Sequence, residues 1–80
     1  MFVEMIYDKR NFEGVPNAKT LILAELTKRV HGTFPNAEVK VKPMVTNSSI
    51  HTDASKAQKA ILAGIVEEMF EDAGNWLGME

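Results

Sequence analysis

The longest run of helical periodicity lies in the last third of the chain, over residues 56–77. At about 100° per residue, the turn of an α-helix, its apolar side chains fall on one half of the helical wheel. These side chains are Ile61, Leu62, Ile65, Val66, Met69, Phe70, Ala73, Trp76 and Leu77. Ser55 and Gln58 have the spacing of a capping box, which satisfies two backbone N–H groups at a helix start. The pattern therefore predicts a helix of about 20 residues that begins after Ser55 and buries one face.

Near the N-terminus, residues 2–7 alternate between two faces, as is typical of a β-strand. Val3, Met5 and Tyr7 share one of these faces. The opposite face carries the charged side chain of Glu4, which is costly to bury. We therefore expect a strand with Val3, Met5 and Tyr7 directed inward.

A second alternating segment covers residues 37–42, with its two valines on one face and charged side chains on the other. Pro43 cannot donate a backbone hydrogen bond, so it is expected at the end of this strand or on a sheet edge. Residues 46–52 fit two structures: a polar turn, or a polar edge strand with Ile50 as its one core contact.

Between these strands, residues 16–31 show the three- and four-residue spacing of an amphipathic helix. Its apolar positions are Ile22, Leu23, Leu26 and Val30. Pro16 suits the first helical turn, where a missing N–H has no cost. Gly32 is expected just past the helix end in the left-handed conformation.

The predicted order of elements is strand, helix, strand, short strand, helix. A strand–helix–strand start implies a right-handed crossover and a parallel pair of strands. A following hairpin would make the sheet mixed, and two helices would cover one face of it. The predicted fold class is therefore α+β: a two-layer β-α-β-β-α sandwich with a small three-stranded mixed sheet. Residues 1–80 are expected to form a single domain.

The polar half of the last predicted helix carries carboxylates without basic neighbours. We call Glu67, Glu68, Glu71 and Asp72 the acidic ridge; no lysine or arginine follows Lys59. Like charges four residues apart and acidic side chains near a helix C-terminus each cost about 0.2–1 kcal/mol. An acidic helix face is often only a solvated surface. The shared sign of these costs favours the alternative, a surface that a basic partner binds.

Charge is distributed unevenly between the two parts of the chain. Residues 1–66 contain all nine lysines and arginines against six acidic residues, whereas residues 67–80 contain five acidic residues and no basic one. The formal net charge of −2 therefore conceals a negative C-terminal end. Such a field can steer a basic partner over about a Debye length, roughly 8 Å at physiological salt.

Candidate catalytic chemistry is sparse. The chain has no cysteine, which excludes disulfides, thiolate metal sites and cysteine nucleophiles. His31 and His51 lie in different predicted elements, and no carboxylate is spaced to orient either one. The five glycines are dispersed and form no phosphate-binding loop. We therefore expect no enzymatic activity, no cofactor and no metal site.

Nucleic-acid and membrane binding are not expected either. Lys40 and Lys42 share one strand face, but no aromatic residue alternates with them and the chain is net negative. No segment approaches the roughly 18 apolar residues of a membrane span, and the N-terminus lacks the basic start of a signal peptide. A cytoplasmic monomer is the default expectation.

With these elements assigned, the chain resembles the DinI family of small DNA-damage-inducible proteins over its whole length. The resemblance rests on F-V-E at 2–4, T-K-R-V at 27–30, F-P-N at 34–36, V-K-V at 39–41, S-K at 55–56 and E-E-M-F-E-D-A-G-N-W-L at 67–77, before the final Glu80. The opening M-F-V-E and the segment V-K-V-K-P-M look most like the MsgA-type branch, which is linked with bacterial virulence and prophages.

The resemblance implies the fold derived above and a partner, RecA, whose filament on single-stranded DNA drives the bacterial SOS response. Family members modulate the recombinase and co-protease activities of RecA, the latter acting on LexA-type repressors and UmuD. Carried over by position, the binding role falls on Glu67, Glu68, Glu71 and Asp72, and on Glu80. The family prototype has an acidic pair just before the tryptophan, where this chain has Gly74 and Asn75.

Two other functions are compatible with the sequence. The first is an interaction protein for a different basic partner, such as a virulence- or prophage-associated regulator, without RecA binding. The second is a small enzyme or ligand-binding domain, which would show converging polar groups in a pocket.

Overall fold

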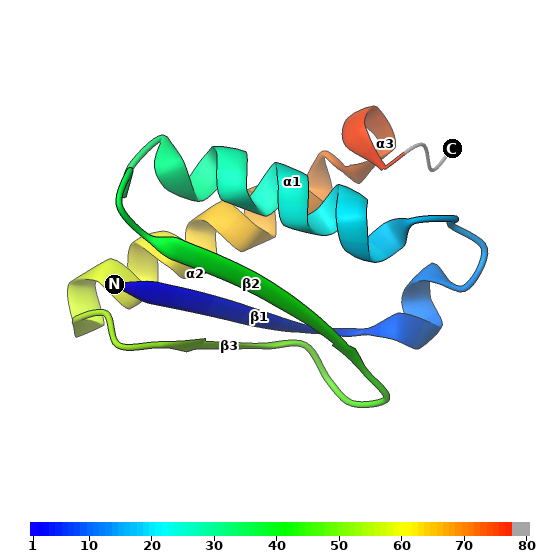
Figure 1. The fold of residues 1–80 in the computed structure, drawn as a ribbon, viewed down its shortest axis with the longest axis horizontal. Helices are drawn as coiled ribbons and strands as arrows, with labels where there is room; N and C mark the ends of the chain where they lie inside the picture. Colours follow the sequence, from blue (N-terminus) through cyan, green and yellow to red (C-terminus); the bar gives the residue numbers. More distant parts are fainter. Residues whose placement is uncertain (78–80) are drawn as a thin grey trace.

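The computed structural model describes residues 1–77 and has the predicted β-α-β-β-α order, with two short helical turns added. The elements are β1 (Phe2–Asp8), the 3-10 turn η1 (Lys9–Phe12), α1 (Ala18–His31), β2 (Glu38–Met44), β3 (Ser49–Thr52), α2 (Lys56–Glu71) and α3 (Ala73–Trp76). Figure 1 shows the three strands in one layer and the helices in the other. The α+β fold class is therefore confirmed.

Strand β1 lies at the centre of the sheet, in the order β2-β1-β3. β1 and β2 are parallel, with Val3 opposite Val39, as the crossover rule predicted. β3 is antiparallel to β1, with Val3 opposite Thr52. The expected hairpin is wrong, because β2 and β3 lie on opposite sides of β1 and do not pair. The sheet is nevertheless mixed, since β1 pairs in parallel on one side and antiparallel on the other.

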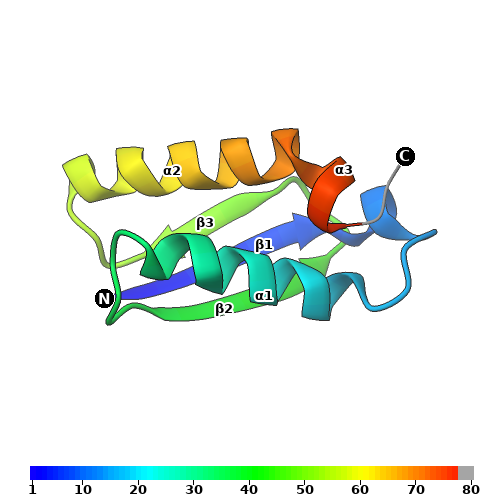
Figure 2. The same cartoon turned by 90° about the horizontal axis from the view of Figure 1, so that it is seen from above.

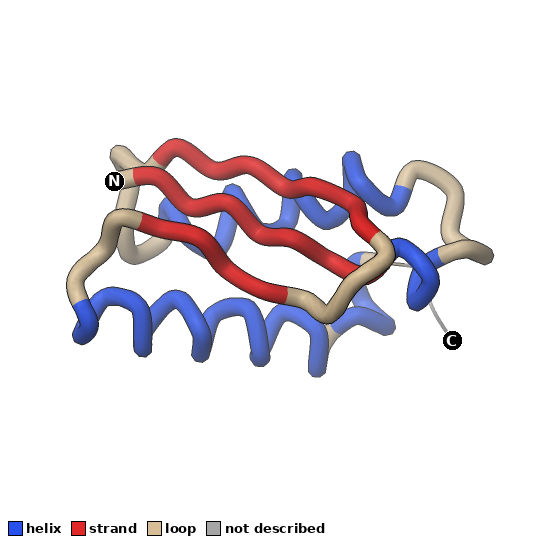
Figure 3. The backbone as a smooth tube through the Cα atoms, turned by 90° about the horizontal axis from the view of Figure 1, so that it is seen from below, coloured by secondary structure: helices blue, strands red, loops and turns tan. Residues whose placement is uncertain are grey.

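Both main helices cover one face of this sheet (Figure 2), and no helix of residues 1–77 covers the other face (Figure 3). The core between the layers contains Val3, Met5 and Tyr7 of β1, Ile22, Leu26 and Val30 of α1, Val41 of β2, and Leu62, Met69 and Leu77 from the C-terminal third. The predicted inward face of β1 is confirmed, because its three residues are at most 3% exposed. Burial also raises the pKa of the Tyr7 hydroxyl.

Helix α1 differs from its prediction at both ends. It begins at Ala18, so Pro16 precedes the first turn instead of lying in it, and Asn17 before it has a positive φ of 60°. Gly32 is right-handed, with φ −63°, so the expected left-handed conformation is wrong. The reason is that the chain keeps turning in the helical sense: the Phe34 N–H donates to the Val30 carbonyl at 2.7 Å.

The two outer strands follow the sequence expectations. β2 continues through Pro43, which is opposite Tyr7 of β1 and lies on an edge strand, where a residue without an N–H is tolerated. Of the two structures considered for residues 46–52, the polar edge strand forms, but only over Ser49–Thr52. Ile50 is half-buried and packs against the core.

Helix α2 lies partly outside the sheet, alongside the outer edge of β3 (Figures 2 and 3). Only a narrow strip of α2 is therefore fully buried, with Leu62 and Met69 at 1% and 0% exposure. Ile61 is 46% exposed, so its expected burial is wrong. Ile61 lies about 100° around the helix from Leu62, and this rotation places it outside the buried strip.

An ion pair at the end of β1 gives the fold a pH dependence. The Arg10 guanidinium donates to the Asp8 carboxylate at 2.7 Å and 2.9 Å, and these hydrogen bonds lower the pKa of Asp8 below its ordinary value of 3.8. A carboxyl whose pKa is lower in the folded state stabilises the fold above its unfolded pKa. This stabilisation is lost as pH falls through the lower, folded value.

We therefore expect wild type to be more stable than Asp8→Asn near neutral pH, with a difference that shrinks as pH falls from about 5 to about 2. Urea unfolding of both proteins across this range measures the difference. A difference that stays constant with pH would show that the charge of Asp8 does not contribute.

Candidate partner-binding surface

The start of α2 is fixed by the capping box that its sequence predicted. The Gln58 N–H donates to the Ser55 hydroxyl oxygen at 3.2 Å, and the Ser55 N–H donates to the Gln58 side-chain oxygen at 3.0 Å. Two of the N–H groups left free at the helix start are thereby satisfied. The start of α2 determines which of its later side chains face the core and which face solvent.

The orientation of α2 about its own axis leaves three carboxylates of the acidic ridge exposed to solvent. Because Leu62 and Met69 face the core, Glu67, Glu68 and Glu71 lie on exposed surface. None of these three glutamates forms an ion pair with another residue of the range 1–77. These three glutamates are therefore the part of the acidic ridge that is free to contact a partner.

The fourth carboxylate of the acidic ridge has a structural partner. The Asp72 carboxylate accepts a hydrogen bond from the Arg29 guanidinium of α1 at 3.0 Å, and a second from the side-chain amide of Asn75. Arg29 also donates to Glu25 at 2.6 Å. The expectation that all four carboxylates lack basic partners is therefore wrong for Asp72, because folding brings α1 against the end of α2. The bond to Glu25 and, secondarily, the bond to Asp72 raise the pKa of Arg29.

Removing the Arg29 guanidinium should destabilise the fold. Arg29→Met is expected to lower the free energy of unfolding by about 1–2 kcal/mol, since it leaves the half-buried Glu25 and Asp72 without their charged donor. The control is Lys28→Met, which removes the same charge from an exposed neighbouring position. Urea unfolding that gives equal losses for both variants would contradict the structural role of Arg29.

Helix α2 stops at Glu71 and does not continue to Leu77 as the periodicity predicted. Asp72 departs from helical geometry, with φ −97° and ψ 13°. Figure 2 shows that α3 then runs in a different direction from α2. The Trp76 indole N–H folds back and donates to the Met69 carbonyl at 2.7 Å. A carbonyl left free at the helix end is thereby satisfied. The turn at Asp72 therefore fixes where the acidic ridge ends.

A row of four aromatic rings lies behind this turn and was not predicted. Tyr7 and Phe12 meet edge-to-face with ring centres 5.6 Å apart, Phe12 and Phe70 are 5.8 Å apart, and Phe70 and Trp76 are 6.1 Å apart. These separations are typical of stabilising aromatic pairs. The rings come from β1, η1, α2 and α3, so no local spacing in the sequence indicates the row. It ties the C-terminal turn to the sheet.

Other candidate residues take different positions. His31 is hydrogen-bonded through Nε2 to the carbonyl of Ala37 at 2.8 Å, and His51 lies on β3. Lys40, considered for phosphate contact, forms an exposed ion pair with Glu38 at 3.4 Å. In residues 1–77, no three His, Cys, Asp or Glu side chains are grouped to hold a metal ion. Helices long and apolar enough to cross a membrane were also not found in that range. Glu80, assigned a binding role by resemblance, lies outside the described residues.

The fold and this surface together define a class: small β-α-β-β-α domains that present exposed carboxylates on the C-terminal helix. The sequence profile of the DinI-like family matches residues 16–77, which include both main helices and the acidic ridge, and the chain belongs to this family. Two relatives, from Salmonella typhimurium and Salmonella typhi, are each named virulence protein MsgA. Each is 56% identical to this chain over 80 residues, which is the full length of both proteins. The similarity to the DinI family inferred from the sequence motifs is thereby confirmed.

Proposed function

We propose that this protein is a non-enzymatic modulator of the RecA filament in the bacterial SOS response. The observation that carries the proposal is the exposed row of Glu67, Glu68 and Glu71 on a helix whose orientation is fixed by packing. Membership of the DinI-like family supports RecA as the partner. A RecA partner would place the protein in the bacterial cytoplasm.

The three exposed glutamates are proposed to make charge-assisted contacts with basic side chains of RecA. They need no conformational change in α2 to do so, because their carboxylates already face solvent. Asp72 contributes differently: its bond to Arg29 holds the end of α2, so it orients the surface and adds less free charge. Glu80 extends the same acidic segment in the sequence and is retained in the proposal.

Binding of the full-length protein to RecA assembled on single-stranded DNA tests the proposal. We expect the protein to co-sediment with these filaments, and less of it to do so as salt is raised, because added ions screen exposed charges. Binding that is absent at low salt, or that does not change with salt, would contradict a charge-based contact.

A second candidate is binding to a different basic protein without RecA. It is favoured by the name of the two Salmonella relatives, virulence protein MsgA, which refers to no DNA-repair activity. The same three glutamates would form the contact. A pull-down with wild type that recovers a basic protein other than RecA, and that loses it when the three glutamates become glutamines, would favour this candidate.

A further inference from the structure

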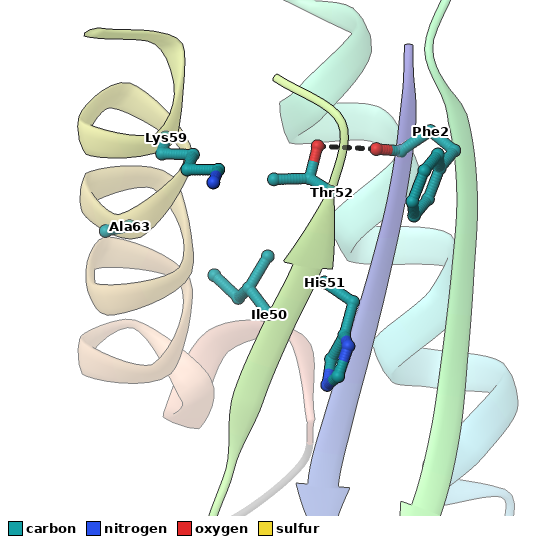
Figure 4. A pocket seen from close by; sticks show the side chains of 6 residues that line it. All are labelled: Phe2, Ile50, His51, Thr52, Lys59 and Ala63. Atoms are coloured by element: carbon teal, nitrogen blue, oxygen red, sulfur yellow. Dashed lines mark hydrogen bonds between the residues drawn. The ribbon is translucent and has the colours of Figure 1, made fainter. Parts of the chain in front are cut away.

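A groove lies between the edge strand β3 and helix α2, away from the acidic ridge. It consists of two adjoining hollows of about 450 Å³ and 280 Å³, which share Ile50 and Ala63 in their walls. The first extends to Thr52 and Lys59, and the second extends to Ser49 and Val66. In Figure 4, Lys59 reaches from α2 toward β3, and Ile50 reaches from β3 toward α2. The volume of the larger hollow is in the range that binding sites use.

The backbone along this groove is an open sheet edge. The Phe2 N–H donates to the Asp53 carboxylate, and its carbonyl accepts from the Thr52 hydroxyl, so Phe2 directs both groups toward the β3 side. Successive residues of a strand direct these groups to alternate sides. Glu4 and Ile6 therefore also face β3, where they pair with His51 and Ser49.

The same alternation directs the N–H and C=O groups of Ile50 and Thr52 away from β1. No fourth strand pairs with β3 in residues 1–77. Unpaired groups of this kind are a template for an added strand. Because α2 runs alongside this edge (Figure 3), an added strand would lie under α2 and have only the length of β3, four residues, to pair with.

The walls of the groove indicate what kind of strand fits. Ile50, Ala63 and Val66 are apolar, and the small side chain of Ala63 leaves room for a partner side chain. Lys59 supplies a positive charge at the Thr52 end and forms no ion pair within the part of the chain that the structure describes. An antiparallel strand, the more stable pairing, has its N-terminal end at Lys59.

We propose that this groove binds an extended segment of a partner protein by strand addition to β3. The segment has an acidic residue at its N-terminal end, against Lys59, followed by alternating residues whose apolar side chains lie over Ile50 and Ala63. The proposal does not depend on RecA, since it uses none of the residues of the acidic ridge.

The test uses the full-length protein and a displayed library of random peptides of about eight residues, long enough to pass both ends of β3. Enriched peptides are expected to alternate between apolar and polar residues and to carry an Asp or Glu near the N-terminus. Ala63→Gln fills the groove from the exposed surface of α2 and should weaken binding of a selected peptide by about tenfold or more. Lys59→Gln should remove the preference for the acidic residue.

Two control variants match these changes. Ala60→Gln makes the same substitution at an exposed position of α2 that lines neither hollow, and Lys56→Gln removes a neighbouring charge in the same way. Both controls are expected to bind the selected peptide as wild type does. Failure to enrich any alternating peptide, or equal binding by the Ala63→Gln and Ala60→Gln variants, would overturn the proposal. Amide hydrogen exchange that is not slowed at Ile50 and Thr52 on binding would overturn strand addition.

Discussion

Replacing Met69 with alanine is expected to lower the free energy of unfolding by about 2–5 kcal/mol. The side chain is fully buried between α2 and the rest of the core, so the substitution leaves a cavity as well as losing apolar contact. An 80-residue domain has a total stability of only about 4–12 kcal/mol. The variant should therefore be extensively destabilised, as measured by urea unfolding followed by circular dichroism.

The matched variant is Ile61→Ala in the same helix. The sequence pattern placed both residues on one apolar face, but the structure leaves Ile61 46% exposed. We expect this variant to lose less than about 1 kcal/mol. Equal losses for the two variants would mean that α2 is rotated relative to the structure, and that Glu67, Glu68 and Glu71 do not face solvent as described.

Replacing Trp76 with alanine is expected to cost about 2–3 kcal/mol, somewhat less than the 3–5 typical of a fully buried ring. The ring is half-buried, packs against Phe70 and donates its indole N–H to the Met69 carbonyl. Both the aromatic contact and the hydrogen bond at the end of α2 are lost in this variant. Thermal unfolding followed by circular dichroism measures the loss without relying on the fluorescence of this single tryptophan.

Trp76→Phe separates the two contributions. Phenylalanine keeps a ring next to Phe70 but has no N–H, so the Met69 carbonyl loses its donor. We expect this variant to lose about 1 kcal/mol, the usual net value of one hydrogen bond. If Trp76→Phe costs as much as Trp76→Ala, the aromatic row contributes nothing and the description of the C-terminal turn is incorrect.

Local features of this fold were predictable from the sequence because neighbouring residues determine them. The inward face of β1 follows from its two-residue alternation, and the start of α2 follows from the spacing of Ser55 and Gln58. The fold class followed from the order of these local features and from the handedness of the crossover between β1 and β2.

Features that depend on how elements pack were not predictable in this way. The pair of Arg29 and Asp72 joins residues 43 positions apart, and no spacing rule relates them. The exposure of Ile61 depends on where α2 lies relative to the sheet edge. A helical wheel gives no information about that position. Several strand orders are compatible with the alternating patterns of the three strands, so these patterns do not determine that β1 is central.

The acidic ridge has a different composition in three dimensions from the one that the sequence suggests. The sequence presents four equivalent carboxylates, whereas the structure separates three exposed glutamates from Asp72, which is bonded to Arg29. A basic partner that binds exposed carboxylates would therefore contact Glu67, Glu68 and Glu71 more readily than Asp72. In the proposed function, Asp72 contributes through the position of the helix end, which its bond to Arg29 holds, as well as through its charge.

The measurement that tests the central claim most directly is fluorescence anisotropy of labelled protein titrated with RecA filaments on single-stranded DNA. It compares wild type with a variant in which Glu67, Glu68 and Glu71 are all changed to glutamine. The control changes Glu4, Glu13 and Glu38 to glutamine, so its net charge changes by the same amount while the exposed face of α2 is untouched.

We expect wild type and the control to bind the filaments alike, and the variant with the three changed α2 glutamates to bind about tenfold more weakly or not at all. Circular dichroism should show that all three proteins are folded, because every changed side chain is exposed except that of Glu4 in the control, which is half-buried. Equal binding by all three proteins would contradict the claim that these glutamates contact RecA. Absence of binding by wild type would contradict RecA as the partner.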